Sequence, residues 1–229
     1  MVAIDGPAGS GKSTVARALA RRLGYRYLDT GAMYRAAAWK LDRSGIPPAE
    51  GVRLSEAISE MEIELRDEMA GLRVRVDGED VTAEIRTPRV AMLASQYSAL
   101  PAVRARLTQL QRRWKSLGGV VAEGRDTTTV VFPDAELKVF LDATPEERAR
   151  RRLAEIEARG TRVDGPTVRQ EIEARDRADA ARPLAPLVRA PNALRIDTTG
   201  LPVEDVVERL AREAERLCST GSANPRLRS

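Results

Sequence analysis

Histidine is absent from this chain of 229 residues. Its absence excludes Ser-His catalytic triads, the usual zinc sites and histidine acid–base catalysis. The single cysteine, Cys218, excludes an internal disulfide framework and a thiol metal cluster, as is typical of a reducing compartment. We therefore expect catalysis to depend on Lys, Arg, Asp, Glu and a metal ion.

Long apolar runs are also absent. No stretch approaches the roughly twenty apolar residues that span a bilayer, and the N-terminus carries no basic-then-apolar leader. We therefore expect a cytoplasmic protein without a membrane partner.

Lysine and aromatic residues are few, so arginine supplies most of the positive charge. Acidic residues nearly balance that charge, and the net charge is +4. So small a net charge does not require a nucleic-acid partner. Because arginine suits phosphate and carboxylate groups, we expect some arginines to gather at one phosphate-rich site and the others to lie on solvated helix faces. Only four lysines are present: Lys12, Lys40, Lys115 and Lys138.

Glycine gathers in a loop near the N-terminus that matches the pattern G-x-x-x-x-G-K-[ST], between an apolar run and an amphipathic stretch. This order predicts a P-loop, in which backbone N–H groups at a helix N-terminus bind phosphates. We expect Lys12 to reach the outer phosphates and the Ser13 hydroxyl to bind Mg²⁺, so the loop predicts a nucleoside triphosphate such as ATP. The alternative is a Gly-rich turn that only joins strand to helix. The loop consists of Gly6, Pro7, Ala8, Gly9, Ser10, Gly11, Lys12, Ser13 and Thr14.

Short apolar strand patterns alternate with helical patterns along the chain, which is typical of an α/β fold. Together with the loop they predict a P-loop NTPase-type, three-layer α/β/α architecture. Helical spacing is also expected over residues 50–66 and from Pro101 to Leu117, and a hairpin over residues 73–81. The expected core strands are residues 2–4, 25–28, 120–122, 137–141 and 194–197.

These patterns divide the chain into four parts. We predict a small β-containing insert on the acceptor side, a helical lid and a disordered tail, arranged around a core P-loop kinase domain. The predicted core comprises residues 1–61, 101–143 and 183–218, the insert residues 62–100, the lid residues 144–182 and the tail residues 219–229.

The predicted lid is rich in arginine. Thr144 and Pro145 are typical of a helix start, and Arg148 and Arg152 share one face of the helix that follows. A second charged helix is expected from about Thr167 to Arg182. A bound polyanion would rationalise like charges on one face, and an exposed pair of Arg/Glu-rich helices is the alternative.

Four blocks together resemble bacterial-type cytidylate kinases of the P-loop nucleoside monophosphate kinase group. The resemblance runs from Val2 to about Leu217. It implies transfer of the γ-phosphoryl group of ATP to CMP or dCMP with Mg²⁺, in pyrimidine nucleotide metabolism, by a protein with a five-stranded parallel sheet and a mobile lid. We also expect a monomer. The blocks are residues 4–14, 28–35 (LDTGAMYR), 78–87 (GEDVTAEIRT), and 124–126 (GRD) together with 130–135 (VVFPDA).

The resemblance also implies roles for individual residues. Around the CMP phosphate it places Thr30, Arg35, Arg125 and Arg182. For reading the cytosine it assigns Ser95, Arg104 and Asp126, and for the ribose Arg175 and Asp179. The lid arginines Arg148 and Arg152 are expected at the transferring group, and the residues expected to be catalytic are Lys12, Arg125, Asp126 and Arg182.

The chain departs from the family pattern in two places. Thr128 stands where the family usually has glycine, which changes the expected backbone of that loop. Ala178, Ala180 and Ala181 stand around Asp179 where polar residues are common, so the choice between CMP and dCMP is left open.

Two other functions fit parts of the sequence. A kinase for another small acceptor, such as shikimate, would need a carboxylate site without base-reading groups, and the 78–87 block argues against it. A nucleotide-dependent switch or RNA-binding protein is suggested by the loop and a pI of about 9.6. It lacks a guanine-reading N-K-x-D run, and the eight aromatic residues form no evident RNA platform.

Overall fold

The computed structural model describes residues 1–69, 71–158, 160 and 163–221. Two compact units divide the chain. The first comprises Met1–Tyr27, Gly118–Ala181 and Ala185–Ser229, and the second comprises Leu28–Leu117 and Arg182–Leu184. The predicted division into core, insert and lid follows different boundaries and stays a prediction.

A five-stranded sheet with the order β2-β6-β1-β7-β8 forms the centre of the fold. β1 runs parallel to β6 and β7, and β7 runs parallel to β8. Every residue of β1 and β6 is buried, as expected for parallel strands covered on both faces. The five predicted core strands are therefore confirmed. Their bounds are Val2–Asp5 (β1), Arg26–Asp29 (β2), Val120–Gly124 (β6), Leu137–Asp142 (β7) and Leu194–Asp197 (β8).

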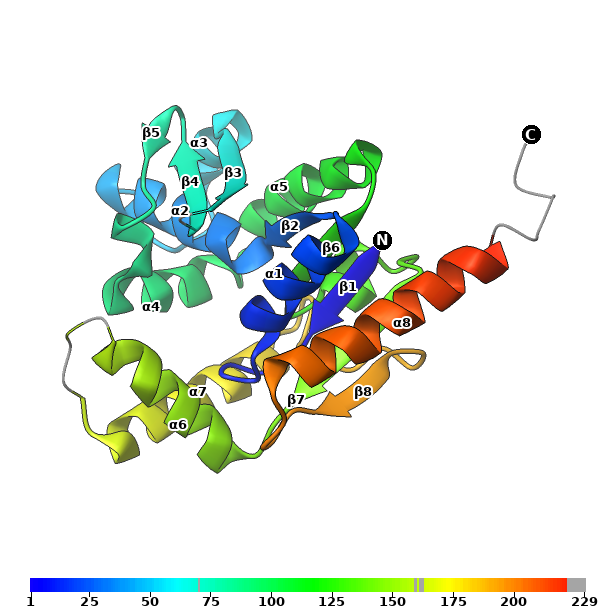
Figure 1. Ribbon diagram of the computed structural model, residues 1–229. Helices are drawn as coiled ribbons and strands as arrows, with labels where there is room; N and C mark the ends of the chain where they lie inside the picture. The colour runs from blue at the N-terminus through cyan, green and yellow to red at the C-terminus, as the bar shows by residue number, and fades with distance from the viewer. Residues whose placement is uncertain (70, 159, 161–162, 222–229) are drawn as a thin grey trace. The chain divides into compact units, whose positions relative to one another are not determined.

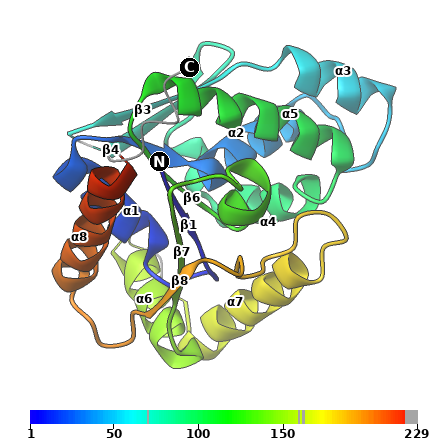
Figure 2. The same ribbon diagram turned by 90° about the vertical axis from the view of Figure 1, so that its right-hand side faces the viewer.

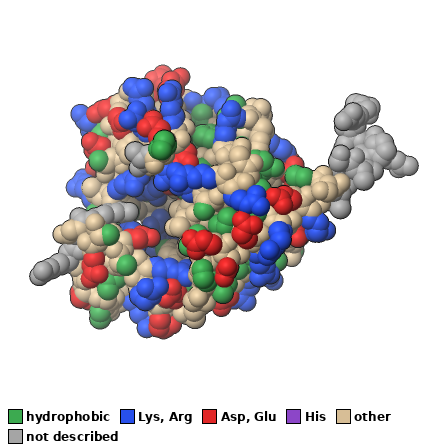
Figure 3. All heavy atoms as spheres, viewed as in Figure 1, with side chains coloured by type: hydrophobic (Ala, Val, Ile, Leu, Met, Phe, Trp, Pro, Cys, Tyr) green, Lys and Arg blue, Asp and Glu red, His purple; other side chains and the backbone are tan. Residues whose placement is uncertain are grey.

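Two pairs of helices belong to the first unit. α1 (Lys12–Leu23) and α8 (Val203–Gly221) lie side by side, as do α6 (Pro145–Glu157) and α7 (Gly165–Ala180) (Figures 1 and 2). On the face that carries α8, basic side chains are interspersed with acidic ones (Figure 3). Arg22 on α1 forms an exposed ion pair with Glu208 on α8 at 2.9 Å. This pair supports the expectation of solvated helix faces. Among the described residues, no helix combines the length and apolar character needed to cross a bilayer.

The start of α6 agrees with the sequence signal, with one difference. The Thr144 hydroxyl accepts a hydrogen bond from Glu147 N, as an N-cap does. The Glu147 carboxylate does not reach back to Thr144 N, as in a reciprocal capping box. It instead accepts hydrogen bonds from Arg150 and Arg151.

The second unit consists of helices and a small antiparallel sheet of order β3-β4-β5. β4 and β5 confirm the predicted hairpin, with the turn at Asp77 and Gly78, which both have positive φ. Its helices are α2 (Thr30–Arg43), α3 (Val52–Glu60), α4 (Pro88–Tyr97) and α5 (Pro101–Arg112), with 3₁₀ turns η1 (Glu84–Arg86) and η2 (Arg113–Leu117). Its strands are β3 (Ile63–Glu68), β4 (Gly71–Val76) and β5 (Glu79–Asp80).

The prediction of a helix from the apolar spacing over residues 50–66 is wrong for the last part of that stretch. The helix ends at Glu60, and β3 pairs antiparallel with β4, placing Leu65 opposite Val74. Pairing in the sheet buries Leu65 and exposes its neighbours Glu64 and Arg66, so tertiary contact overrides the local pattern. The helix predicted from Pro101 to Leu117 likewise becomes 3₁₀ after Arg112.

The tail prediction falls mostly outside the described residues. α8 continues to Gly221, so residues 219–221 are helical, and residues 222–229 are not described.

We expect Leu141→Ala to destabilise the fold. Leu141 is 0% exposed in β7, so truncation leaves a cavity and should lower the free energy of unfolding by about 2–5 kcal/mol. Leu201, which is 43% exposed, supplies the control Leu201→Ala. Urea denaturation would measure both variants, and equal losses would contradict the assignment of β7 to the core.

Candidate active site

The phosphate-binding loop lies between β1 and α1, and backbone from two other elements packs closely against it. Gly6 has φ +153°, and a Cβ built on it would lie 2.0 Å from the backbone oxygen of Leu141. A Cβ on Gly9 would lie 2.7 Å from the backbone oxygen of Arg148 in α6. Only glycine fits both positions, so the loop packs directly on β7 and on the first turns of α6.

The Lys12 ammonium is buried inside this loop. Its Nζ donates hydrogen bonds to the backbone oxygen of Pro7 at 2.6 Å and to the Ser10 hydroxyl at 3.4 Å. The pKa of Lys12 is lowered to about 7, first by burial and then by the positive charge of Arg125, while the negative charge of Glu123 acts in the opposite direction. A polyanion bound to the loop would restore the charged form, because negative charge nearby stabilises an ammonium.

Ser13 and Glu123 meet at the carboxyl end of β6. The Ser13 hydroxyl donates a hydrogen bond to Glu123 Oε1 at 2.7 Å, and the Glu123 side chain is buried. Sequence reasoning placed Ser13 at the metal and did not select Glu123, although an acidic residue that ends a core strand was a usable signal.

This pair fits Mg²⁺, which prefers oxygen ligands and retains phosphate and water ligands. Among the described residues, no group of three or more Cys, Asp or Glu side chains is placed to hold a metal ion. A magnesium ion would therefore be bound by few protein oxygens, as in other nucleotide sites.

The loop after β6 is fixed by a buried carboxylate that the sequence did not suggest. Asp5, 0% exposed, accepts hydrogen bonds from the backbone N–H and the hydroxyl of both Thr127 and Thr128, at 2.6–2.8 Å. Thr128 lies in the π-helical turn η3 (Thr127–Val131) and has no positive φ. Threonine is thus compatible with this backbone, and its hydroxyl adds a bond that a glycine would lack.

Arg125 and Asp126 lie directly before this turn. Arg125 Nε donates to Asp179 Oδ2 at 2.8 Å, and the Asp179 side chain is 1% exposed. Asp126 is buried as well. The structure thus brings together the predicted residues Lys12, Arg125 and Asp179. Arg175, also predicted, is close enough to lower the pKa of Lys12.

The arginines of α6 separate into three environments. Arg148 Nη1 donates to the backbone oxygen of Ala8 in the loop, at 3.1 Å. Arg152 instead pairs with Glu155 on its own helix at 3.1 Å. Arg151, which the sequence did not select, donates to both oxygens of Thr198, and a Cβ on Gly11 would lie 3.3 Å from its Nη1. Arg151, rather than Arg152, is therefore the second α6 arginine at the loop.

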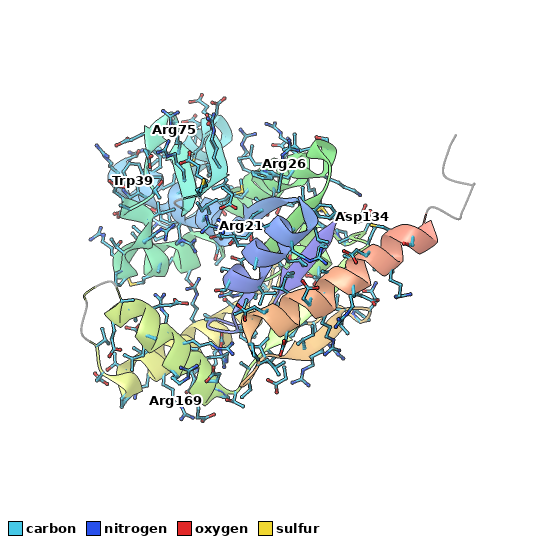
Figure 4. The ribbon with its side chains drawn as sticks, in the orientation of Figure 1. Arg21, Arg26, Trp39, Arg75, Asp134 and Arg169 are labelled. Carbon is cyan, nitrogen blue, oxygen red and sulfur yellow. The ribbon has the colours of Figure 1, made fainter. Side chains whose placement is uncertain are left out.

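Arg169, in the predicted lid, agrees with the alternative of exposed, solvated helices. Arg169 on α7, labelled in Figure 4, pairs with Glu146 at 3.2 Å and with Glu173 at 2.9 Å. Such exposed pairs contribute little to stability.

The second unit holds the other predicted acceptor residues. Asp29, and not Thr30, caps α2, since Asp29 Oδ1 accepts from Ala32 N at 2.7 Å, and its other oxygen pairs with Arg35 at 3.0 Å. Capping therefore does not account for the buried Thr30 side chain.

Arg104 lies on α5, and Ser95 lies on the preceding helix, α4. Arg104 is buried, donates to the backbone oxygen of Ser98 at 3.0 Å, and lies with its guanidinium carbon 5.6 Å from the ring centre of Tyr34. Ser95 and Arg182 are partly exposed residues of this unit. A single acceptor site combining these residues with Arg125 stays a prediction.

Comparison with known proteins identifies the family. The profile of the family described as "Cytidylate kinase" matches residues 2–216. The chain belongs to the cytidylate kinase family. A cytidylate kinase of Pelotomaculum thermopropionicum is 54% identical over 208 residues, covering 90% of this chain and 92% of that protein. One of Symbiobacterium thermophilum is 48% identical over 217 residues, covering 94% and 96%.

Among solved structures, one of an uncharacterized protein from Eubacterium ventriosum has a TM-score of 0.51 at 12% identity. The match covers 94% of this chain and 97% of that one, and shows a shared fold alone. Membership of the family confirms the resemblance seen in the sequence and the prediction of a nucleoside monophosphate kinase with a P-loop fold.

We expect Thr128→Val to weaken the turn that follows Asp126. The substitution removes one donor from the buried Asp5 carboxylate and should lower the free energy of unfolding by about 1–3 kcal/mol. Thr129→Val is the matched control, because the Thr129 hydroxyl makes only a 3.5 Å contact with Asp126 O. Urea denaturation of both variants checks this, and an unchanged Thr128→Val protein would show that the hydroxyl is dispensable.

Proposed function

We propose that this enzyme transfers the γ-phosphoryl group of ATP to CMP or dCMP, with the phosphate-binding loop holding the donor. The observation that carries the proposal is the buried Lys12, whose pKa of about 7 reflects burial and the nearby guanidinium of Arg125. Lys12 and Arg125 repel each other when no anion is bound, and both would stabilise the phosphates of a bound nucleotide. In phosphoryl transfer, such fixed charge contributes most of the catalysis.

We propose Mg²⁺ as the metal, held through Ser13 with Glu123 beside it. When bound, the ion neutralises phosphate charge and orients the phosphate oxygens. The 2.7 Å hydrogen bond from Ser13 to Glu123 holds the Ser13 hydroxyl at the carboxyl end of β6. The oxygen of that hydroxyl would bind the ion there.

The acceptor role of Arg125 is supported by its contact with Asp179. The carboxylate fixes the guanidinium at the end of β6, where it can bind the CMP phosphate. Asp179 would then serve Arg125 in addition to the ribose. We retain Arg175, Asp126 and the second-unit residues Thr30, Arg35, Ser95, Arg104 and Arg182 as acceptor residues.

The reaction requires no strong general base. The attacking group is a phosphate that is already largely ionised at neutral pH, so positioning and charge neutralisation suffice. The absence of histidine from the sequence is compatible with this chemistry. The proposed role of Arg148 is to supply positive charge to the transferring group, and its hydrogen bond to the loop residue Ala8 supports this role.

The monomeric state, the cytoplasmic location and the movement of the lid stay predictions. The contact of Gly9 with α6 supports a lid seated on the loop.

Purified protein with ATP and Mg²⁺ should form ADP faster with CMP than with AMP, GMP or UMP. A coupled ADP-formation assay with each acceptor measures this preference. Shikimate belongs in the same assay because it represents another small-acceptor kinase. Preference for any acceptor other than CMP or dCMP would refute the proposal.

Lys12→Ala should leave a folded protein with phosphoryl transfer reduced on the order of a hundredfold or more, as expected for loss of a preorganised charge. Lys138→Ala is the control, since Lys138 contacts Asn192 away from the loop. Both kcat values come from the same ADP assay. Near-normal turnover by Lys12→Ala would exclude the proposed role.

A further inference from the structure

Asp176 on α7 brings a carboxylate onto the phosphate-binding loop. Its Oδ1 accepts a hydrogen bond from the backbone N–H of Ala8 at 3.0 Å. Its Oδ2 accepts from Arg148 Nη1, and the same nitrogen donates to the backbone oxygen of Ala8. The N–H and the carbonyl of one loop residue, Ala8, are therefore both hydrogen-bonded to an ion pair formed between α6 and α7.

This ion pair is shielded from solvent. The side chains of Arg148 and Asp176 are 10% and 17% exposed, so their attraction is screened less than that of a surface pair. Arginine has a long side chain with many rotamers, and fixing its guanidinium requires more than one contact. Asp176 and the Ala8 carbonyl supply those contacts.

The position of the pair relates it to phosphoryl transfer. Arg148 also contacts the loop through its backbone, which lies against Gly9. The carboxylate of Asp176 is close enough to Lys12 to raise that residue's pKa, opposing the effects of burial and of Arg125 and Arg175. Asp176 therefore contacts Arg148 and lies near Lys12, two of the cations at the loop.

We infer that Asp176 is a positioning residue for phosphoryl transfer: it holds the Arg148 guanidinium and α7 in place on the phosphate-binding loop. This inference rests on the proposed role of Arg148 at the transferring group. Asp176 touches no reacting atom and acts through Arg148.

Asp176→Asn tests the charge while keeping an oxygen that can accept from Ala8 N. We expect kcat to fall on the order of tenfold, because a charge-assisted hydrogen bond becomes a neutral one, with the KM values for ATP and CMP changed less than about twofold. Glu173→Gln removes the same charge from the same helix. Glu173 pairs directly with Arg169 and Arg177 and acts on Arg148 only through longer-range attraction, so the kcat of this variant should change less than about twofold. A carboxylate that merely competes with the donor's phosphates would give the opposite result for Asp176→Asn, a lower KM for ATP without loss of kcat, and this would overturn the inference.

A double-mutant cycle tests whether Asp176 acts through Arg148. Arg148→Ala with Asp176→Ala should have the same kcat as Arg148→Ala alone, since the partner is already lost. Independent, multiplying losses would refute the positioning role, and so would a normal kcat for Arg148→Ala. Thermal unfolding of each variant confirms that the proteins compared are folded.

One readout does not depend on activity. In Asp176→Ala the Ala8 amide should exchange with solvent at least about tenfold faster than in the parent protein, as measured by NMR, because its acceptor is removed. Glu173→Gln should leave that rate unchanged. An unchanged Ala8 rate in Asp176→Ala refutes the contact itself, whereas faster exchange in a protein that does not phosphorylate CMP would show that the proposed function, and not the contact, has failed.

Discussion

The burial of one ammonium group among guanidinium groups is the constraint on which the site depends. Lys12 is enclosed by its own loop, and burial together with the charge of Arg125 lowers its pKa to about 7. Because this folded-state pKa lies below the value of about 10.4 in an unfolded chain, Lys12 opposes folding most strongly below pH 7, and this effect disappears as the pH rises toward 10.4. The surrounding structure therefore has to hold the loop in place despite the burial of this charge and its repulsion by Arg125.

Direct backbone packing and buried carboxylates meet that requirement. Gly6 and Gly9 let β7 and α6 approach the loop without side chains in between. Asp5 accepts four hydrogen bonds from the turn after Asp126, which links the strand before the loop to the segment that carries Arg125. Asp179 holds Arg125 itself. Lys12 and Arg125 are thus each held by hydrogen bonds to neighbouring groups, as preorganised charge requires.

The sequence predicted the elements of local origin and the family, but not the long-range contacts. The loop pattern identified Lys12 and Ser13 as candidate site residues, and the apolar stretches predicted the five core strands. Each of these signals lies within a few residues of the chain. Asp176 forms its contact with Ala8 across 168 positions of the chain, and no spacing rule connects them. Arg151 was missed because a shared helix face selects Arg148 and Arg152 alike, while only the fold shows which arginine turns to the loop. β3 was missed because its pairing with β4, rather than its own periodicity, makes it a strand.

Titration of the Lys12 side chain tests the account most directly. The chain has only four lysines, so NMR of protein labelled with ¹³C and ¹⁵N in lysine resolves each side chain, and Lys12→Met assigns the signal. In the nucleotide-free enzyme Lys12 should titrate near pH 7, and addition of ATP should move that titration to higher pH. A Lys12 side chain that titrates near 10.4, the ordinary value for lysine, in the free enzyme and does not respond to ATP would contradict the account.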